Sequence, residues 1–115
     1  MNMEDEIYPR PLTSRVQVHM EKIANAILEY KEVTGGLPTG SNANMVKALK
    51  SLNPRIFFRR ELNAKDEVID PWGRPYVYLV PGRENPKLFD LYSMGPTGKG
   101  KARPGDIIRC ELFRI

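Results

Sequence analysis

The residues of this sequence that could perform chemistry are few and stand apart. The single histidine is His19 and the single cysteine is Cys110. A general base needs a nucleophile and an orienting group beside it, and no such motif surrounds His19, which we interpret as a partly exposed helix residue. Cys110 alternates with Ile108 and Leu112, which is typical of a small core residue rather than a reactive thiol.

Sequence motifs of known catalytic sites are also absent. The sequence contains no GxSxG, no HExxH, no phosphate-binding GxxxxGK[ST] and no GxGxxG. Its one cysteine excludes an internal disulfide and a thiolate metal cage. We therefore predict that the chain is not an enzyme and has no catalytic residues and no cofactor-binding residues.

A basic loop, residues 95–106 with the sequence GPTGKGKARPGD, offers a different chemistry. Cations here and beyond it could follow a phosphate backbone while an aromatic side chain stacks on a base. The cations are Lys99, Lys101, Arg103, Arg109 and Arg114, and the aromatic is Tyr92 or Phe113. Such loops also carry lysines simply to stay solvated, and no recognised nucleic acid motif is present, so we favour a solvated loop. The alternative function is a soluble binding module that uses Lys99–Arg103 to bind nucleic acid or another anionic partner.

The segment 70–80, DPWGRPYVYLV, raises the question of a stacking platform or a structural corner. Asp70 and Pro71 suit the first two positions of a β-turn, and Gly73 completes it. Pro75 can begin the strand that follows, because its missing N–H is harmless there. We interpret the segment as a corner, with Trp72 folded over the edge of the core.

The strand after this corner has two different faces. Tyr76 and Tyr78 share one face, and Val77 and Leu79 share the other. Further along, LFDLYSMG alternates in the same way, and a final strand lies within IIRCELFRI. The region 68–115 is therefore predicted to be an antiparallel sheet of about three strands.

A long amphipathic helix is predicted over residues 14–33. Its apolar stripe follows steps of four, three, four and three residues and consists of Val16, Met20, Ile23, Ile27 and Tyr30. Thr13 or Ser14 can cap its start. The sequence TGGLP ends it, because Gly35 and Gly36 can adopt a left-handed cap.

A shorter helix is predicted over residues 43–52, with Asn42 or Asn44 as its cap and Pro54 beyond its end. Residues 55–62 fit either a short strand or an irregular segment, and residues 63–67 form a turn. One or two helices before three antiparallel strands indicate an α+β fold, with the long helix laid across a small sheet.

Composition places limits on these readings. The 115 residues suffice for one domain, 1–115, in which residues 1–13 precede the long helix as a flexible segment. A net charge of +4 favours an anionic partner only weakly. No apolar run approaches the ~20 residues of a membrane span, and the start has no secretory signal pattern, so we expect the chain as given to be soluble.

The order of these features resembles the soluble domain of the major pseudopilin of type II secretion systems, the general secretion pathway protein G family. The resemblance runs from about residue 23 to 108 and is most specific at DPWG, PY and FDLYSMG. The residues that carry this signature are Asp70, Pro71, Trp72, Gly73, Pro75, Tyr76 and Gly95.

The resemblance implies a type IV pilin-like fold and a mechanical role. Family members are anchored in the inner membrane by an apolar N-terminal helix, processed by a prepilin peptidase with methylation, and assembled with other pseudopilin subunits and inner-membrane components. Their filament acts on the periplasmic side in the export of folded proteins. The resemblance thus implies a structural subunit with no small-molecule substrate.

Two departures from the family pattern bear on these expectations. The apolar N-terminal segment is missing from MNMEDEIYPRPLTSR. The chain is therefore expected to be either a trimmed soluble domain or a soluble relative without an anchor. We favour the trimmed domain, because the apolar stripe is typical of the second half of a longer helix.

The second departure concerns calcium, which the resemblance implies in the loop before the last strand. The family stretch is similar to SLGADG…DI, and here the match is SMGPTGKGKARPGDI. Asp106 matches one metal-binding aspartate, but Thr97 stands at the position of the other and three cations lie between. Because Ca²⁺ prefers several hard, mostly anionic oxygen ligands, we expect no tight calcium site.

Overall fold

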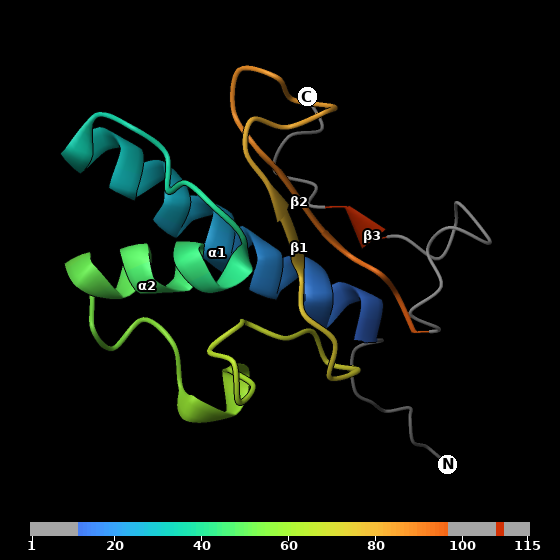
Figure 1. The fold of residues 1–115 in the computed structure, drawn as a ribbon. Coiled ribbons are helices and arrows are strands. Elements are labelled where there is room, and N and C mark those ends of the chain that lie inside the picture. Colours follow the sequence, from blue (N-terminus) through green and yellow to red (C-terminus); the bar gives the residue numbers. More distant parts are fainter. Residues whose placement is uncertain (1–11, 97–107, 110–115) are drawn as a thin grey trace, which may run out of the picture.

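The structure is a computed structural model that describes residues 12–96 and 108–109. Within these residues, two α-helices precede three short strands, and one 3-10 turn lies between them (Figure 1). The elements are α1 (Leu12–Thr34), α2 (Asn42–Leu52), η1 (Arg59–Glu61), β1 (Val77–Leu79), β2 (Asp90–Ser93) and β3 (Ile108–Arg109). The predicted α+β order of helices and strands is confirmed.

The sheet is antiparallel, with the order β1-β2-β3. Tyr78 pairs with Leu91 in the first ladder, and Tyr92 pairs with Arg109 in the second. The helix α1 packs against β2 and β3, whereas α2 packs against α1 and β1. Figure 1 shows the long helix crossing behind the strands, with α2 beside it. This is the arrangement expected of a pilin-like fold, a long helix on a small antiparallel sheet.

The apolar stripe of α1 forms the centre of the core. Val16, Met20, Ile23 and Ile27 are fully buried, and Tyr30 is half-buried. Burial of four such side chains stabilises the fold by roughly 1.5–3 kcal/mol each. The 3.6-residue period therefore identified the packed face correctly.

The ends of α1 were predicted with mixed success. The helix begins at Leu12, so Thr13 and Ser14 lie inside its first turn and the predicted capping role is wrong. The apolar stripe starts only at Val16, and it therefore carries no information about the preceding turn. At the other end, Gly35 has a φ of 88° and its N–H donates to the Lys31 carbonyl at 2.8 Å, as a left-handed cap requires.

The start of α2 differs from the prediction in a useful way. Ser41 is the N-cap residue, and the Asn44 side chain reaches back to accept its backbone N–H at 3.1 Å. Asn42, the other predicted cap, is the first helical residue and is buried. The prediction failed because a capping asparagine and a buried asparagine look alike in sequence.

The buried Asn42 side chain connects α2 to the segment that leads into the sheet. Its amide nitrogen donates to the carbonyls of Val68 at 3.0 Å and Tyr76 at 2.8 Å. Its oxygen accepts the Val68 N–H at 2.8 Å. Three hydrogen bonds from one carboxamide thus hold helix and sheet in one geometry.

A second connection runs from β1 to the loop after α1. The hydroxyl of Tyr78 donates to the Pro38 carbonyl at 2.6 Å in a buried position. Burial raises the pKa of Tyr78 to about 12, so the hydroxyl keeps its proton at neutral pH.

The ambiguous segment 55–62 is irregular and ends in η1. Phe57 is buried, whereas the next residue, Phe58, is exposed. The predicted turn at 63–67 is confirmed, since the Asp66 N–H donates to the Asn63 carbonyl at 3.0 Å. Within residues 12–96 and 108–109, none of the helices has both the length and the apolar character that a membrane crossing requires.

Replacing Asn42 by Ala should destabilise the domain by about 2–4 kcal/mol, because it leaves the Val68 N–H and the Tyr76 carbonyl buried without this partner. Asn44→Ala is the matched control on the same helix, and its loss of a cap contact should cost about 1 kcal/mol or less. Urea unfolding followed by circular dichroism measures both. Equal effects of the two substitutions would contradict the connecting role of Asn42.

Candidate functional site

The corner at residues 70–73 is built around a buried carboxylate. The Gly73 N–H donates to the Asp70 carbonyl at 2.9 Å, and Gly73 has a φ of 84°, so the predicted turn is present. One carboxylate oxygen of Asp70 accepts the backbone N–H groups of Trp72 at 3.0 Å and Arg74 at 2.9 Å. The aspartate therefore holds the turn that it begins.

The other oxygen of Asp70 joins this corner to the end of β2. It accepts the Ser93 hydroxyl at 2.8 Å, and the same Ser93 oxygen accepts the Gly95 N–H at 3.0 Å. Arg74 adds a hydrogen bond from its guanidinium to the Pro96 carbonyl at 3.2 Å. Two distant parts of the sequence signature, Asp70 and Gly95, thus meet through Ser93.

The aromatic residues of the corner lie against the core. Tyr76 and Tyr78 are buried, and Trp72 is half-buried and packs against the core cluster. Pro75 forms an isolated bridge with Ile69 just before β1. Since the rings of both tyrosines are covered, they offer no stacking platform to a ligand.

His19 lies in a hydrogen-bonded cluster that joins α1 to two later segments. Its Nε2 lies 2.8 Å from a carboxylate oxygen of Glu61, and its Nδ1 lies 2.8 Å from the Tyr76 hydroxyl. Because an ionised carboxylate only accepts, Nε2 donates to Glu61, and Nδ1 forms the hydrogen bond with the Tyr76 hydroxyl. Lys22 also donates to Glu61, at 3.0 Å. Both ring nitrogens of His19 are thus engaged.

Electrostatics in this cluster favour a charged Glu61 and a neutral Tyr76. Burial alone would raise the pKa of Glu61, but hydrogen bonds from the Phe58 N–H, Lys22 and His19 outweigh it and lower this pKa below its ordinary value of 4.5. Burial, together with the carboxylates of Asp70 and Glu61, raises the pKa of Tyr76 well above its usual range. We call this cluster of His19, Lys22, Glu61 and Tyr76 the clamp, because its hydrogen bonds hold α1 to η1 and to the segment before β1.

Sequence reasoning placed His19 correctly as a partly exposed helix residue but did not identify its partners. Glu61 is separated from it by 42 positions and Tyr76 by 57. No local spacing signals contacts at such a separation. The lone histidine beside an apolar stripe was the only available hint.

A second buried carboxylate, Asp90, was also missed as a structural centre. Its oxygens accept the backbone N–H groups of Arg83 at 2.7 Å, Glu84 at 3.1 Å and Asn85 at 3.1 Å. A Cβ added at Gly82 would lie 2.5 Å from this carboxylate, which explains the glycine there. Asp90 thus organises the loop between β1 and β2.

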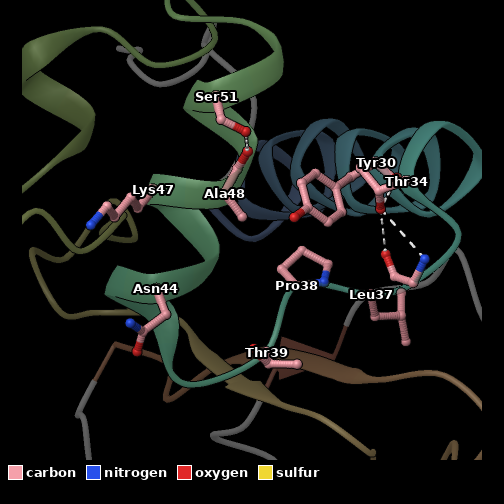
Figure 2. A pocket seen from close by; sticks show the side chains of 10 residues that line it. Tyr30, Thr34, Leu37, Pro38, Thr39, Asn44, Lys47, Ala48 and Ser51 are labelled. Carbon is pink, nitrogen blue, oxygen red and sulfur yellow. Dashed lines mark hydrogen bonds between the residues drawn. The ribbon is translucent and has the colours of Figure 1, made fainter.

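An open hollow lies between the end of α1 and α2 (Figure 2). The Thr34 hydroxyl there donates within its own chain segment, to the Tyr30 carbonyl at 2.8 Å. The Ser51 hydroxyl likewise donates to the Ala48 carbonyl of its own helix. Lys47 is the one charged side chain among the lining residues. Both of these hydroxyl groups are therefore engaged by the backbone of their own chain segments.

Several residues predicted to carry chemistry lie outside the described residues. They are Thr97, Lys99, Lys101, Arg103, Asp106, Cys110, Phe113 and Arg114. Arg109 is described only as part of β3, and Tyr92 is half-buried in β2. Over residues 12–96 and 108–109, His, Cys, Asp and Glu side chains form no group of three or more that could hold a metal ion.

Comparison with known proteins gives this architecture a family. The family model described as type II secretion system (T2SS), protein G, matches residues 11–109. The chain belongs to the type II secretion system protein G family. A curated relative, type II secretion system core protein G of Pseudomonas aeruginosa (strain PAO1), is 34% identical over 100 residues, which cover 82% of this chain and 68% of the relative. No solved structure matches significantly.

Membership of the protein G family makes this chain a pseudopilin component of a type II secretion system, a machinery of protein transport. The match spans the helix α1, the corner at 70–73 and the sheet, which are the parts connected by the buried polar contacts. The resemblance stated from DPWG and FDLYSMG is thereby confirmed.

Replacing Glu61 by Gln should make the free energy of unfolding change less as the pH is lowered. A carboxylate whose folded-state pKa is lowered stabilises the fold above its unfolded-state pKa, and this contribution is lost as the pH falls through the folded-state pKa. We therefore expect wild type to be the more stable at about pH 7 and the difference in the free energy of unfolding to shrink below about pH 4.5.

Urea unfolding across this pH range measures the difference, and Glu29→Gln, an exposed substitution on α1, is the control. The control should change stability by less than about 0.5 kcal/mol throughout. A Glu61→Gln difference that persists unchanged to about pH 3 would refute the linkage.

Proposed function

We propose that this chain is a structural subunit of a type II secretion pseudopilus, a non-catalytic filament protein that contributes to the export of folded proteins. The observation that carries the proposal is the family match, which extends over residues 11–109 and so includes the whole helix-and-sheet domain. The domain with the long α1 helix packed against a small sheet is the unit that such a filament would contain in repeated copies.

The hydrogen-bond partners of the buried polar groups in the described residues support a non-catalytic role. The carboxylate oxygens of Asp70 and Asp90 accept hydrogen bonds from backbone N–H groups and from a serine hydroxyl. Both ring nitrogens of His19 are hydrogen-bonded within the domain. A catalytic group has to meet its substrate, and these groups already have internal partners. Their work is to fix the fold.

The expected partners are other pseudopilin subunits and inner-membrane components of the secretion system. We place the protein on the periplasmic side of the inner membrane, held there by an apolar N-terminal helix of the kind that the family resemblance implies. The comparisons give no support to the alternative of a nucleic acid-binding module built on Lys99–Arg103.

Deleting the gene for this chain in its source organism should abolish export of type II substrates, with the substrates accumulating in the periplasm. Complementation with the wild-type gene should restore export, and deletion of another gene of the same system is the positive control. Immunoblots of medium and periplasm measure the distribution. Normal export without this gene, alongside a block in the positive control, would refute the proposal.

We further propose that the loop 95–106 binds no Ca²⁺ tightly, because Asp106 stands with Thr97 and three cations in place of an anionic ligand set. Thermal unfolding should shift by less than about 1 °C between EDTA and about 100 μM Ca²⁺. A matched Mg²⁺ titration controls for nonspecific cation effects. Stabilisation by several degrees with Ca²⁺ alone would show that the loop is a calcium site.

A further inference from the structure

Exposed cations lie around the exposed ring of Phe58, next to the His19–Glu61–Tyr76 cluster, with which they share Lys22. Phe58 is 61% exposed, and Val18 on α1 is 55% exposed. We call this region the basic–aromatic surface; it comprises Arg15, Val18, Lys22, Lys50, Phe58, Arg59 and Arg60. Large exposed apolar side chains surrounded by cations mark a surface that a partner can cover.

Two parts of this surface are in contact with each other. Arg15, Val18 and Lys22 follow one another at steps of three and four residues, so they share one face of α1. The Lys22 ammonium lies 6.0 Å from the centre of the Phe58 ring, and the Arg60 guanidinium lies 4.8 Å from it. The helix face and the segment before η1 therefore meet at Phe58.

Two hollows are lined in part by residues of this surface. One is lined by Arg15, Arg60 and the corner, and the other is lined by Lys50, Arg59 and Phe57. Both contain room for side chains of a partner beside cationic groups.

The acidic groups near these hollows leave the cations in excess. Glu61 already pairs with Lys22 and His19, and the buried Asp70 is held by its own turn. Asp66 lines the second hollow, where Lys50 and Arg59 outnumber it. The surface therefore carries a positive charge that an anionic partner complements.

We propose that the basic–aromatic surface docks a short acidic segment of a partner protein that carries at least one large apolar side chain. Arginine guanidinium groups bind carboxylates in a two-point geometry, which suits Arg15, Arg59 and Arg60. An apolar side chain of the partner would cover Phe58, the aromatic member of the surface. The proposal does not depend on the filament role.

The geometry favours a protein segment over a nucleic acid. A nucleic acid base stacks flat on an aromatic face, and two cations already lie over the Phe58 ring. An apolar side chain of a protein needs no such face and can pack on the rest of this residue, which is 61% exposed. Carboxylates can approach those cations from outside without displacing them from the ring.

A membrane surface fits less well than a protein segment. Membrane association needs several apolar side chains to insert together, and here Val18 and Phe58 are dispersed among charged groups. A short peptide that carries one apolar side chain can bind at a single exposed apolar group such as Phe58, so it fits this surface better than a membrane does.

The test begins with selection of displayed random 12-residue peptides on the immobilised wild-type domain, with counter-selection on Arg60→Glu. Selected peptides should be net acidic and contain Phe, Trp or Leu. A selection that yields no peptides specific for wild type, or peptides without acidic bias, would overturn the proposal.

The best selected peptide is then labelled with a fluorophore, and its affinity for each variant is measured. Comparing variants separates the effect of a charge at this surface from the effect of the same charge change elsewhere on the domain. Arg60→Glu should weaken binding at least tenfold, whereas Lys87→Glu, an exposed substitution with the same charge change in the β1–β2 loop, should weaken it less than twofold. Phe58→Ala should weaken binding at least fivefold, with Val33→Ala, also exposed, as its control. Thermal unfolding confirms that each variant is folded, and equal loss in variant and control overturns the proposal.

Other occupants are tested with the same variants. Binding to phosphatidylglycerol vesicles or to single-stranded DNA that is tighter than to any selected peptide, and that Arg60→Glu abolishes, would replace the protein partner by a membrane or a nucleic acid. Sedimentation velocity of the wild-type domain should show no self-association sensitive to Arg60→Glu. Self-association lost in this variant would assign the surface to a second copy and overturn the proposal.

Discussion

Three hydrogen bonds between the Asn42 carboxamide and the backbone of Val68 and Tyr76 join the helical half of this domain to its sheet half. The strands themselves contain only three, four and two described residues. A ladder that short contributes few hydrogen bonds, so it cannot by itself set the position of the sheet on α1. Asn42 and the Tyr78 hydroxyl supply the missing constraints from outside the ladder.

The two buried aspartates act in the same way at either end of the sheet. Asp70 joins the corner to the end of β2 through Ser93, and Asp90 gathers three backbone N–H groups of the β1–β2 loop. A buried carboxylate is tolerated only when such donors replace its water, and here they do so. Loops of this domain are therefore held by side chains rather than by regular secondary structure.

Polar groups inside the domain and charged groups on its proposed binding surface have different roles. His19, Tyr76, Tyr78 and the two buried aspartates are engaged internally, which agrees with a structural subunit of a secretion machinery. Charge available to a partner lies elsewhere, around the exposed Phe58 and the arginines beside it. A pseudopilin built in this way presents a docking face distinct from the polar groups that hold its fold together.

The sequence by itself determined the order of elements, the buried face of α1, the turn at 70–73 and the family. Each of these depends on residues close together in the chain: the 3.6-residue apolar period, a Gly after a helix, and the Asp-Pro-x-Gly spacing of a turn. Only the tertiary structure decided that Asn42 is buried rather than a cap, that His19 meets Glu61 and Tyr76, and that Lys22 and Arg60 flank Phe58. The reason is that most of these contacts join groups tens of residues apart, and a polar side chain has the same local pattern whether its partner is water or a distant backbone group.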